Sequence, residues 1–261
     1  MAATNPGSAG FEVYCNLDEA GGSNALDSSP NGHDLTETGG TIESTDGGRE
    51  FAIAHTEWFE KADHADYSFG DEDFSMGGWV KLAAQATDQS IIAKYDSTND
   101  DREYFLRYGV GSDRYEFRVN HTGLAGATVT ANNYGAVPAT TKAFVLGWHD
   151  SAANKTYISI NNGAADEAAS QGCNDNISPL QIGALNGAAP TNYMGGILWS
   201  CFIARKVFTA NEREWLYNAG VPRKWSEIYF VPKVVFLCDF GKTCKKVNGL
   251  WRPRNLGLSG A

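Results

Sequence analysis

The sequence predicts an all-β protein of antiparallel strands, arranged as a sandwich or a barrel. Short segments alternate apolar and polar residues with a period of two, and turn-forming residues separate them at short intervals. The 261 residues include 29 glycines and 31 Phe, Trp and Tyr residues. Glycines supply turns, and aromatic side chains suit half-buried pleated surfaces. The frequent strand and turn signals therefore favour a sandwich or barrel over a parallel βαβ fold.

The expected strands follow one another along most of the chain. They lie at 74–82, 104–108, 115–119, 143–148, 156–160, 180–183 and 196–203. A Gly-Val-Gly-Ser-Asp spacer between the second and third is typical of a hairpin. A polar turn ending at Asn154 and the turn Asn161-Asn162-Gly163 bound the fifth.

One short helix is expected near 210–219. Thr209 and Glu212 have the spacing of a capping box, in which each side chain accepts a hydrogen bond from the other residue's backbone N–H. Trp215 and Leu216 supply an apolar face, and Gly220 suits the residue after the helix.

Charge divides the chain into a predicted sandwich domain, 1–221, and a basic C-terminal extension, 222–261. The chain carries a net charge of −10, with 13 Lys/Arg and 29 Asp/Glu in the first part. The extension has two acids and eight basic residues: Arg223, Lys224, Lys233, Lys242, Lys245, Lys246, Arg252 and Arg254. We expect an arm that docks on other proteins or on a second copy, with simple solvation of its charges as the alternative. The acidic body disfavours nucleic acid as the main partner.

The termini and cysteines bear on the compartment. The first ten residues have neither the basic nor the apolar region of a secretory signal, and the longest apolar run, Ile197–Ala204, is too short to span a bilayer. The five cysteines are expected to be reduced thiols. Cys238 and Cys244 could face each other across a hairpin, so a disulfide between them is the alternative for this pair.

Several motifs occur in the order found in one known family. They are Asp27-Ser-Ser-Pro-Asn-Gly-His-Asp34, the stretch 57–82 with its acidic loop and "DFSMGGWVKL" strand, Trp148-His-Asp with Ile158-Ser-Ile-Asn-Asn-Gly163, Pro179-Leu-Gln-Ile-Gly183, and Phe208–Gly220. Over roughly residues 10–220 the chain thus resembles the laminin-G-like jelly rolls of the concanavalin A-like lectin and glucanase superfamily.

The resemblance implies two antiparallel sheets packed face to face. It also implies binding of glycans, proteins or calcium, or a role as a non-catalytic module. The family pattern places acids where this chain has Met194 and Leu198. Because calcium needs several oxygen ligands, a family-type calcium site is not expected here.

Catalysis is not expected. Glycosidases of this architecture need two carboxyl groups, which the family presents as Glu-x-Asp-x-x-Glu on one strand. No such run occurs, and Asp71-Glu72-Asp73 are adjacent acids whose side chains alternate in direction on a strand.

No metal and no cofactor are expected either. A histidine and acid cluster lies in the acidic loop, without recognised ligand spacing: His55, His64, Glu57, Glu60, Asp63 and Asp66. His121 has no evident partner in the sequence.

Aromatic rings near strand ends could stack on sugars, and neighbouring amides could hydrogen-bond to hydroxyl groups. The candidate ligand-binding residues are Trp79, Tyr95, Tyr104, Tyr134, Asn132 and Asn133. The competing interpretation places these rings in the core or under loops.

The main functional expectation is a non-catalytic structural or accessory protein of a virion, such as a bacteriophage decoration, fibre or tail protein, assembled in the host cytoplasm. A cytoplasmic protein is the alternative location. A carbohydrate-binding, lectin-like module is the alternative function, and a glycoside hydrolase is the second alternative. Surface glycans are possible ligands of the virion protein and of the lectin-like module.

Overall fold

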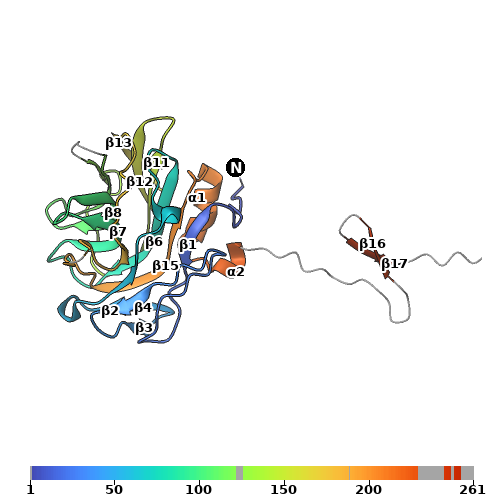
Figure 1. Cartoon of the computed structure of the whole chain (residues 1–261), viewed down its shortest axis with the longest axis horizontal. Helices are drawn as coiled ribbons and strands as arrows, with labels where there is room; N and C mark the ends of the chain where they lie inside the picture. Colours follow the sequence, from blue (N-terminus) through green and yellow to red (C-terminus); the bar gives the residue numbers. More distant parts are fainter. Residues whose placement is uncertain (1, 122–125, 188, 229–243, 248–249, 254–261) are drawn as a thin grey trace, which may run out of the picture. The chain divides into compact units, whose positions relative to one another are not determined.

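The computed structural model describes residues 2–121, 126–187, 189–228, 244–247 and 250–253. The chain divides into two compact units, Met1–Ile228 and Tyr229–Ala261. The first is a sandwich of two antiparallel sheets with a short helix beside it (Figure 1), which confirms the predicted fold class. In the second, β16 (Cys244–Val247) pairs with β17 (Leu250–Pro253).

The first sheet has eight strands in the order β13-β12-β11-β6-β15-β4-β3, and β1 also pairs with β15. Its strands are β1 (Phe11–Cys15), β3 (Glu43–Thr45), β4 (Gly48–Phe51), β6 (Phe74–Leu82), β11 (Ala143–Asp150), β12 (Lys155–Ile160), β13 (Asp166–Ala169) and β15 (Gly196–Ala204). Strands that are far apart in the sequence pair in this sheet, so it links the early part of the chain to the late part.

The second sheet has seven strands in the order β10-β9-β8-β7-β14-β5-β2. Its strands are β2 (Thr36–Thr38), β5 (Trp58–Lys61), β7 (Gln89–Asp96), β8 (Asp101–Gly109), β9 (Arg114–Val119), β10 (Ala127–Thr130) and β14 (Leu180–Ile182). The helical elements are the 3-10 turns η1 (Ile53–His55), η2 (Ala65–Tyr67) and η3 (Asn218–Gly220), and the helices α1 (Ala210–Tyr217) and α2 (Trp225–Ile228).

The main core lies between the two sheets, and strand periodicity selects its members. In β6, Met76 and Val80 point into this core, whereas Trp79 points to the other side of the sheet. Gly147 of β11 leaves room for the opposite sheet, because a Cβ atom there would lie 2.5 Å from the ring of Phe117. The two sheets therefore approach closely at this point.

A bulge at Ser200 reverses the alternation of β15. The register with β6 shifts between Trp199 and Phe202, and Ser200 has φ of +47°. Leu198 faces the main core before the bulge, and Cys201 faces it after the bulge. One extra residue thus keeps apolar side chains on both faces of a strand that is buried throughout.

A second core fills the space between the outer face of the eight-stranded sheet and the helices. Trp79, Phe144 and Phe202 of the sheet belong to this cluster together with Leu216 of α1. Figure 1 shows α1 on this outer side, with β7 and β8 on the far side of the sandwich. The sheet is therefore apolar on both faces, which explains its long buried strands.

The predicted capping box starts α1. Thr209 Oγ1 accepts from the Glu212 N–H at 3.3 Å, and Glu212 Oε2 accepts from the Thr209 N–H at 2.8 Å.

Thr209→Ala should lower the free energy of unfolding by about 1 kcal/mol, measured by urea denaturation. Thr87→Ala, at an exposed loop threonine, is the matched control and should change it by less than about 0.5 kcal/mol. Equal effects of both changes would argue against a stabilising cap.

The compact unit continues past the boundary expected at residue 221. Ile228 of α2 is buried in the second core, and the Trp225 ring lies 5.7 Å from Phe11 and 5.4 Å from Tyr14. These contacts place residues 222–228 with the sandwich.

Among the cysteines whose side chains the structure describes, Cys15, Cys173 and Cys201 are free and buried. Cys15 and Cys201 are register partners on β1 and β15. Burial raises the pKa of all three thiols, which keeps them protonated near neutral pH. The possible pair of Cys238 with Cys244 lies outside the described side chains.

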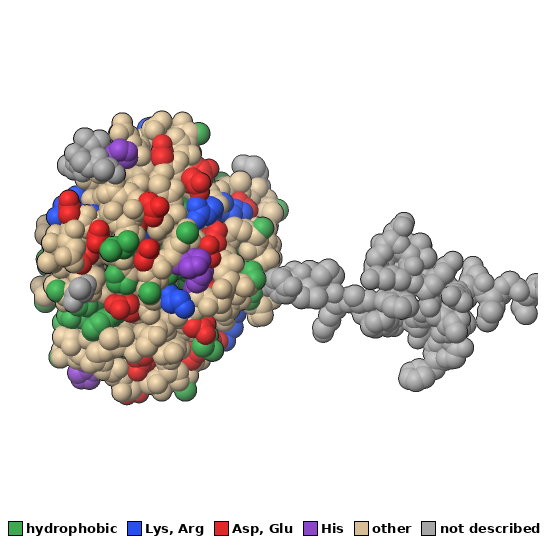
Figure 2. Space-filling view, in the orientation of Figure 1, with side chains coloured by type: hydrophobic (Ala, Val, Ile, Leu, Met, Phe, Trp, Pro, Cys, Tyr) green, Lys and Arg blue, Asp and Glu red, His purple; other side chains and the backbone are tan. Residues whose placement is uncertain are grey.

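The surface of the sandwich is mainly polar. Figure 2 shows acidic side chains (red) spread over the face in view, with basic ones (blue) among them. Among the helices that the structure describes, none has the length and apolar character needed to cross a membrane.

Candidate functional site

Two of the sequence-predicted ligand residues belong to the cores. Trp79 is 2% exposed and Tyr104 is 0% exposed. The Trp79 ring stacks on Tyr217 of α1, and the Tyr104 hydroxyl donates to the Tyr67 carbonyl at 2.6 Å. The period-two pattern correctly placed both rings on strands. The prediction that these rings lie at the surface and bind a ligand is wrong, because another layer of the protein covers the sheet face on which each ring lies.

Tyr95 lies on the outer face of the seven-stranded sheet. It is half-buried, its ring lies 5.3 Å from that of Phe105, and the Arg102 guanidinium lies 6.0 Å from it. Ala93 and Leu185 complete this small apolar cluster.

Asn132, Asn133 and Tyr134 lie together in the loop that follows β10. The Asn133 backbone N–H donates to Asp166 Oδ2 at 2.8 Å, and its Nδ2 donates to the Ala165 carbonyl at 3.2 Å. The loop is thereby fastened to the start of β13. Three strand pairings separate β10 from β7, so these residues and Tyr95 do not form one site.

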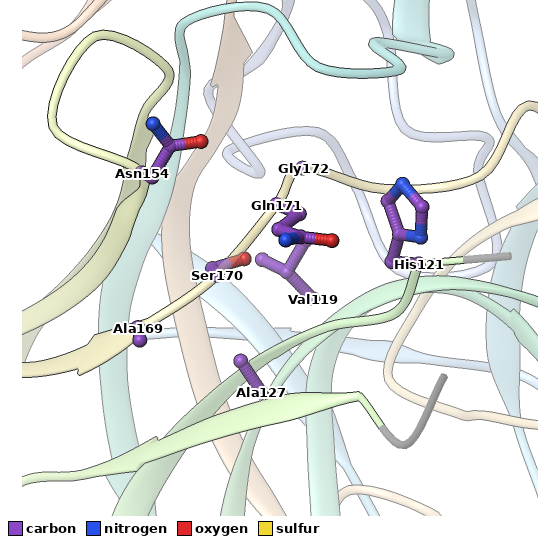
Figure 3. Close-up of a pocket in the computed structure, with 8 residues that line it drawn as sticks. All are labelled: Val119, His121, Ala127, Asn154, Ala169, Ser170, Gln171 and Gly172. Atoms are coloured by element: carbon purple, nitrogen blue, oxygen red, sulfur yellow. The ribbon is translucent and has the colours of Figure 1, made fainter. Parts of the chain in front are cut away.

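A hollow of about 480 Å³ lies where the edges of the two sheets meet, and we call it the seam hollow. β10, the edge of one sheet, runs beside β13, the edge of the other. The hollow is lined by Val119, His121, Ala127, Asn154, Ala169, Ser170, Gln171 and Gly172 (Figure 3). The lining comes from four separate segments of the chain.

Backbone hydrogen bonds fix the wall that follows β13. The Ser170 N–H donates to the Asn154 carbonyl at 2.9 Å, and the Cys173 N–H donates to the Gly70 carbonyl at 2.7 Å. Gly172 has φ of +82°, and a Cβ atom there would lie 2.5 Å from Asp71 Cα. Only glycine fits this close approach, so the wall is held against the 70–71 turn.

The polar groups of the seam hollow suit hydrogen bonding to a neutral ligand. Figure 3 shows the Ser170 hydroxyl and the Gln171 amide turned toward the space between His121 and Asn154. Ser170 is 7% exposed, and its Oγ is buried without a hydrogen-bond partner. A buried hydroxyl without a partner costs about 1–3 kcal/mol. Because this oxygen has almost no accessible surface, a ligand can satisfy it only after a neighbouring side chain moves. Neither an acid nor an aromatic ring of Phe, Trp or Tyr is among the eight lining residues.

A second polar and aromatic group lies on the outer face of the seven-stranded sheet, and the sequence interpretation missed it. The rings of Trp58 and Tyr193 are 5.9 Å apart and half-buried. Glu60 Oε2 accepts from Trp58 Nε1 at 3.1 Å and from Gln181 Nε2 at 2.9 Å. The strand pattern around residue 58 was a signal for one half-exposed tryptophan, but only the fold brings Tyr193 beside it.

The basic residues of the expected docking arm divide between the two units. The Arg223 guanidinium lies over the Trp215 ring at 4.1 Å, and Lys224 Nζ pairs with Asp18 Oδ2 at 2.5 Å. Both are therefore engaged with the sandwich. Of the others, Lys245 and Lys246 belong to β16 and Arg252 to β17, while Lys233, Lys242 and Arg254 lie outside the described residues.

The chain matches no protein-family model and no curated protein sequence. Solved structures do match it. The binding domain of Paraclostridial Mosquitocidal Protein 1 is 13% identical with a TM-score of 0.62, over 81% of this chain and 52% of that one. The binding domain of botulinum neurotoxin DC in complex with SialylT is 13% identical with a TM-score of 0.57, over 81% and 52%.

Domain 4 of AbnA, a GH43 extracellular arabinanase from Geobacillus stearothermophilus, in complex with arabinotriose, also matches. It is 14% identical with a TM-score of 0.59, over 80% of this chain and 98% of that one. The chain spans about half the length of the toxin binding domains and nearly all of the arabinanase domain. These likenesses establish the fold: the chain is a concanavalin A-like jelly roll, as the sequence motifs indicated.

None of these three matched structures is described as a catalytic domain. The eight residues that line the seam hollow include no carboxylate, and two carboxyl groups are what hydrolysis of a glycosidic bond requires.

Proposed function

We propose that the chain is a carbohydrate-binding domain and that the seam hollow holds the glycan. The observation that carries the proposal is the buried, unpartnered Ser170 hydroxyl in a hollow lined by an imidazole and two amides. Sugar hydroxyls both donate and accept hydrogen bonds, so one ligand class matches all of these groups.

The lining selects a neutral saccharide. Asn154 and Gln171 each offer an amide, and neither Lys, Arg, Asp nor Glu is among the lining residues. An acidic sugar would lose hydration on entry without meeting a fixed positive charge. Neutral oligosaccharides such as arabinotriose are therefore the preferred ligands, and sialylated glycans are expected to bind less tightly.

The comparisons support this ligand class by analogy. The arabinanase domain was solved with arabinotriose, and the toxin binding domain with SialylT. At identities of 13–14% the ligands of those proteins are suggestions for this chain, so the choice rests on the hollow itself.

Ser170→Ala is the test variant, measured by isothermal titration calorimetry with arabinotriose. The change should weaken binding roughly 5- to 30-fold, which corresponds to a loss of about 1–2 kcal/mol for one hydrogen bond. It should not lower the free energy of unfolding, because the hydroxyl has no partner in the ligand-free protein.

Thr87→Ala is the matched control, because this exposed hydroxyl lies in the loop between β6 and β7 and is not among the lining residues. It should leave the affinity unchanged. Absence of binding to arabinotriose and to a wider panel of neutral glycans would contradict the proposed function. Equal affinities for Ser170→Ala and the unchanged protein would show that the ligand binds at another surface.

Assembly into a virion through the basic arm stays a separate prediction. Its test compares the full chain with a version ending at Ile228, which keeps the whole first unit. We expect the full chain to be incorporated into particles and the shortened version to be left out. Equal incorporation of the two versions would contradict the prediction.

A further inference from the structure

Two histidines and an aspartate meet on the sandwich, away from the residues that line the seam hollow. His33 lies in the loop before β2, and His64 and Asp66 belong to the turn around η2. One ligand atom from each lies within 4.8 Å of the other two. The sequence interpretation considered His64 and Asp66 but paired them with His55, which lies outside this group.

The distances are those of a compact polar cluster. His33 Nε2 lies 2.6 Å from Asp66 Oδ2, and His64 Nδ1 lies 3.4 Å from the same oxygen. The two imidazole rings are 4.6 Å apart. Ligand atoms around a tetrahedral zinc ion are separated by about 3.4 Å, since each lies about 2 Å from the metal. The His64 Nδ1–Asp66 Oδ2 distance already has that spacing, whereas the His33 Nε2–Asp66 Oδ2 distance of 2.6 Å would have to lengthen when a metal binds.

The fold holds each member in place. The His33 backbone N–H donates to Asp27 Oδ2 at 2.8 Å, and its ring packs edge-on against Tyr67 at 5.3 Å. His64 caps η2 through its Nδ1, which accepts from the Asp66 N–H at 3.2 Å, and a metal bound at this nitrogen would take the place of that hydrogen bond. The His33 side chain is 8% exposed, whereas those of His64 and Asp66 are 50% and 37% exposed. The cluster thus has a rigid inner member and an opening to solvent.

The neighbouring charges permit a cation. The Arg205 guanidinium lies near the cluster, but its Nε pairs with Glu12 at 3.4 Å and its Nη1 pairs with Glu72. Its Nη2 donates to the Ala65 and Asp66 carbonyls at 3.0 and 3.1 Å. The positive charge of this arginine is therefore balanced by its own two carboxylates, and the Asp66 carboxylate stays directed at the histidines.

We propose that His33, His64 and Asp66 bind one divalent transition-metal ion of the zinc class, with water completing the coordination. Imidazole nitrogen is a preferred ligand of Zn²⁺, and a carboxylate supplies a matching negative charge. Calcium is disfavoured because two of the three ligands are nitrogens. The ion would link the loop before β2 to the η2 turn and so stabilise the sandwich.

The test is calorimetric titration of the chelator-treated full chain with ZnCl₂ alone. One equivalent should bind, and His64→Asn should weaken binding by roughly 100-fold or more, because it removes a direct ligand, and loss of a mere supporting partner already costs about 10- to 100-fold. Asparagine removes the imidazole but retains a capping oxygen for the Asp66 N–H, so η2 is preserved. His55→Asn is the matched control because His55 is exposed and outside the cluster, and it should leave the affinity unchanged.

Co²⁺ substitution gives a second readout that does not depend on His33, whose replacement risks unfolding. Visible d–d bands that His64→Asn abolishes would support the site. A thiolate-to-cobalt charge-transfer band would overturn it, because the cysteines would then hold the metal. No saturable zinc binding, or equal zinc affinity in the His64→Asn and unchanged proteins, would also overturn it.

Discussion

Lys94→Met is expected to lower the free energy of unfolding by about 3–5 kcal/mol at pH 8, because the buried carboxylate of Glu103 would lose its positively charged partner. Lys94 and Glu103 are both 0% exposed. Lys94 Nζ contacts Glu103 Oε1 and the Asn176 carbonyl, and it lies 2.8 Å from Asp63 Oδ1. The methionine side chain fills similar space without the charge. Urea denaturation measures the change.

The penalty should shrink as the pH falls. Burial raises the pKa of Glu103 to about 7, against the attraction of Lys94, which lowers it. Removing Lys94 raises that pKa further, so the folded variant binds a proton that the unfolded chain releases above its ordinary carboxyl pKa. Stability of the variant therefore increases as the pH falls from 8 to 5. Adding Glu103→Gln should remove most of this pH dependence.

Lys155→Met is the matched control. Lys155 also pairs with an acid, Glu167, but these side chains are 40% and 51% exposed. Solvent screens this pair, so the free energy of unfolding should stay nearly unchanged. Equal losses for the two lysine variants would contradict the buried role of Lys94.

Trp79→Ala is expected to cost about 3–5 kcal/mol, because it opens a cavity in the second core. The Trp79 ring stacks on Tyr217 at 5.8 Å and packs against Phe144 at 5.3 Å. It is one of the contacts between the sheet and α1. Urea denaturation should give a lower midpoint with an unchanged slope.

Trp58→Ala is the control for loss of an indole ring. Trp58 is half-buried on the outer face of the other sheet, so its removal should cost less than that of Trp79. Trp79→Phe should retain glycan affinity, since the ring has no access to a ligand. A glycan affinity that falls with Trp79→Phe at unchanged stability would contradict the assignment of this ring to the core.

The strands with clear alternation could be predicted from the sequence almost to their ends. The expected strand 74–82 matches β6, and 156–160 lies within β12. β7 was missed because its buried face includes Lys94 and a register shift, which interrupt the apolar pattern. The short edge strand β13 was missed because two of its four residues are exposed.

The candidate site could not be predicted, because its parts come from distant segments. His121 follows β9, Asn154 lies in the turn before β12, and Ser170 follows β13. Their meeting depends on how the edges β10 and β13 close the sandwich. The apolar pattern placed Trp79 and Tyr104 on strands correctly, but it carries no information on the layer outside each sheet. For the same reason His33 could not be connected with His64.

The most direct test of a glycan in the seam hollow is the position of a bound saccharide. Backbone amide chemical shifts of the isotope-labelled chain, recorded during titration with arabinotriose, locate it by NMR. The expected result is saturable shifts at His121, Ser170 and Gln171, with none at Trp58 or Tyr193. Shifts centred on Trp58 and Tyr193 would contradict the seam site, and no shifts with any neutral glycan would contradict carbohydrate binding itself.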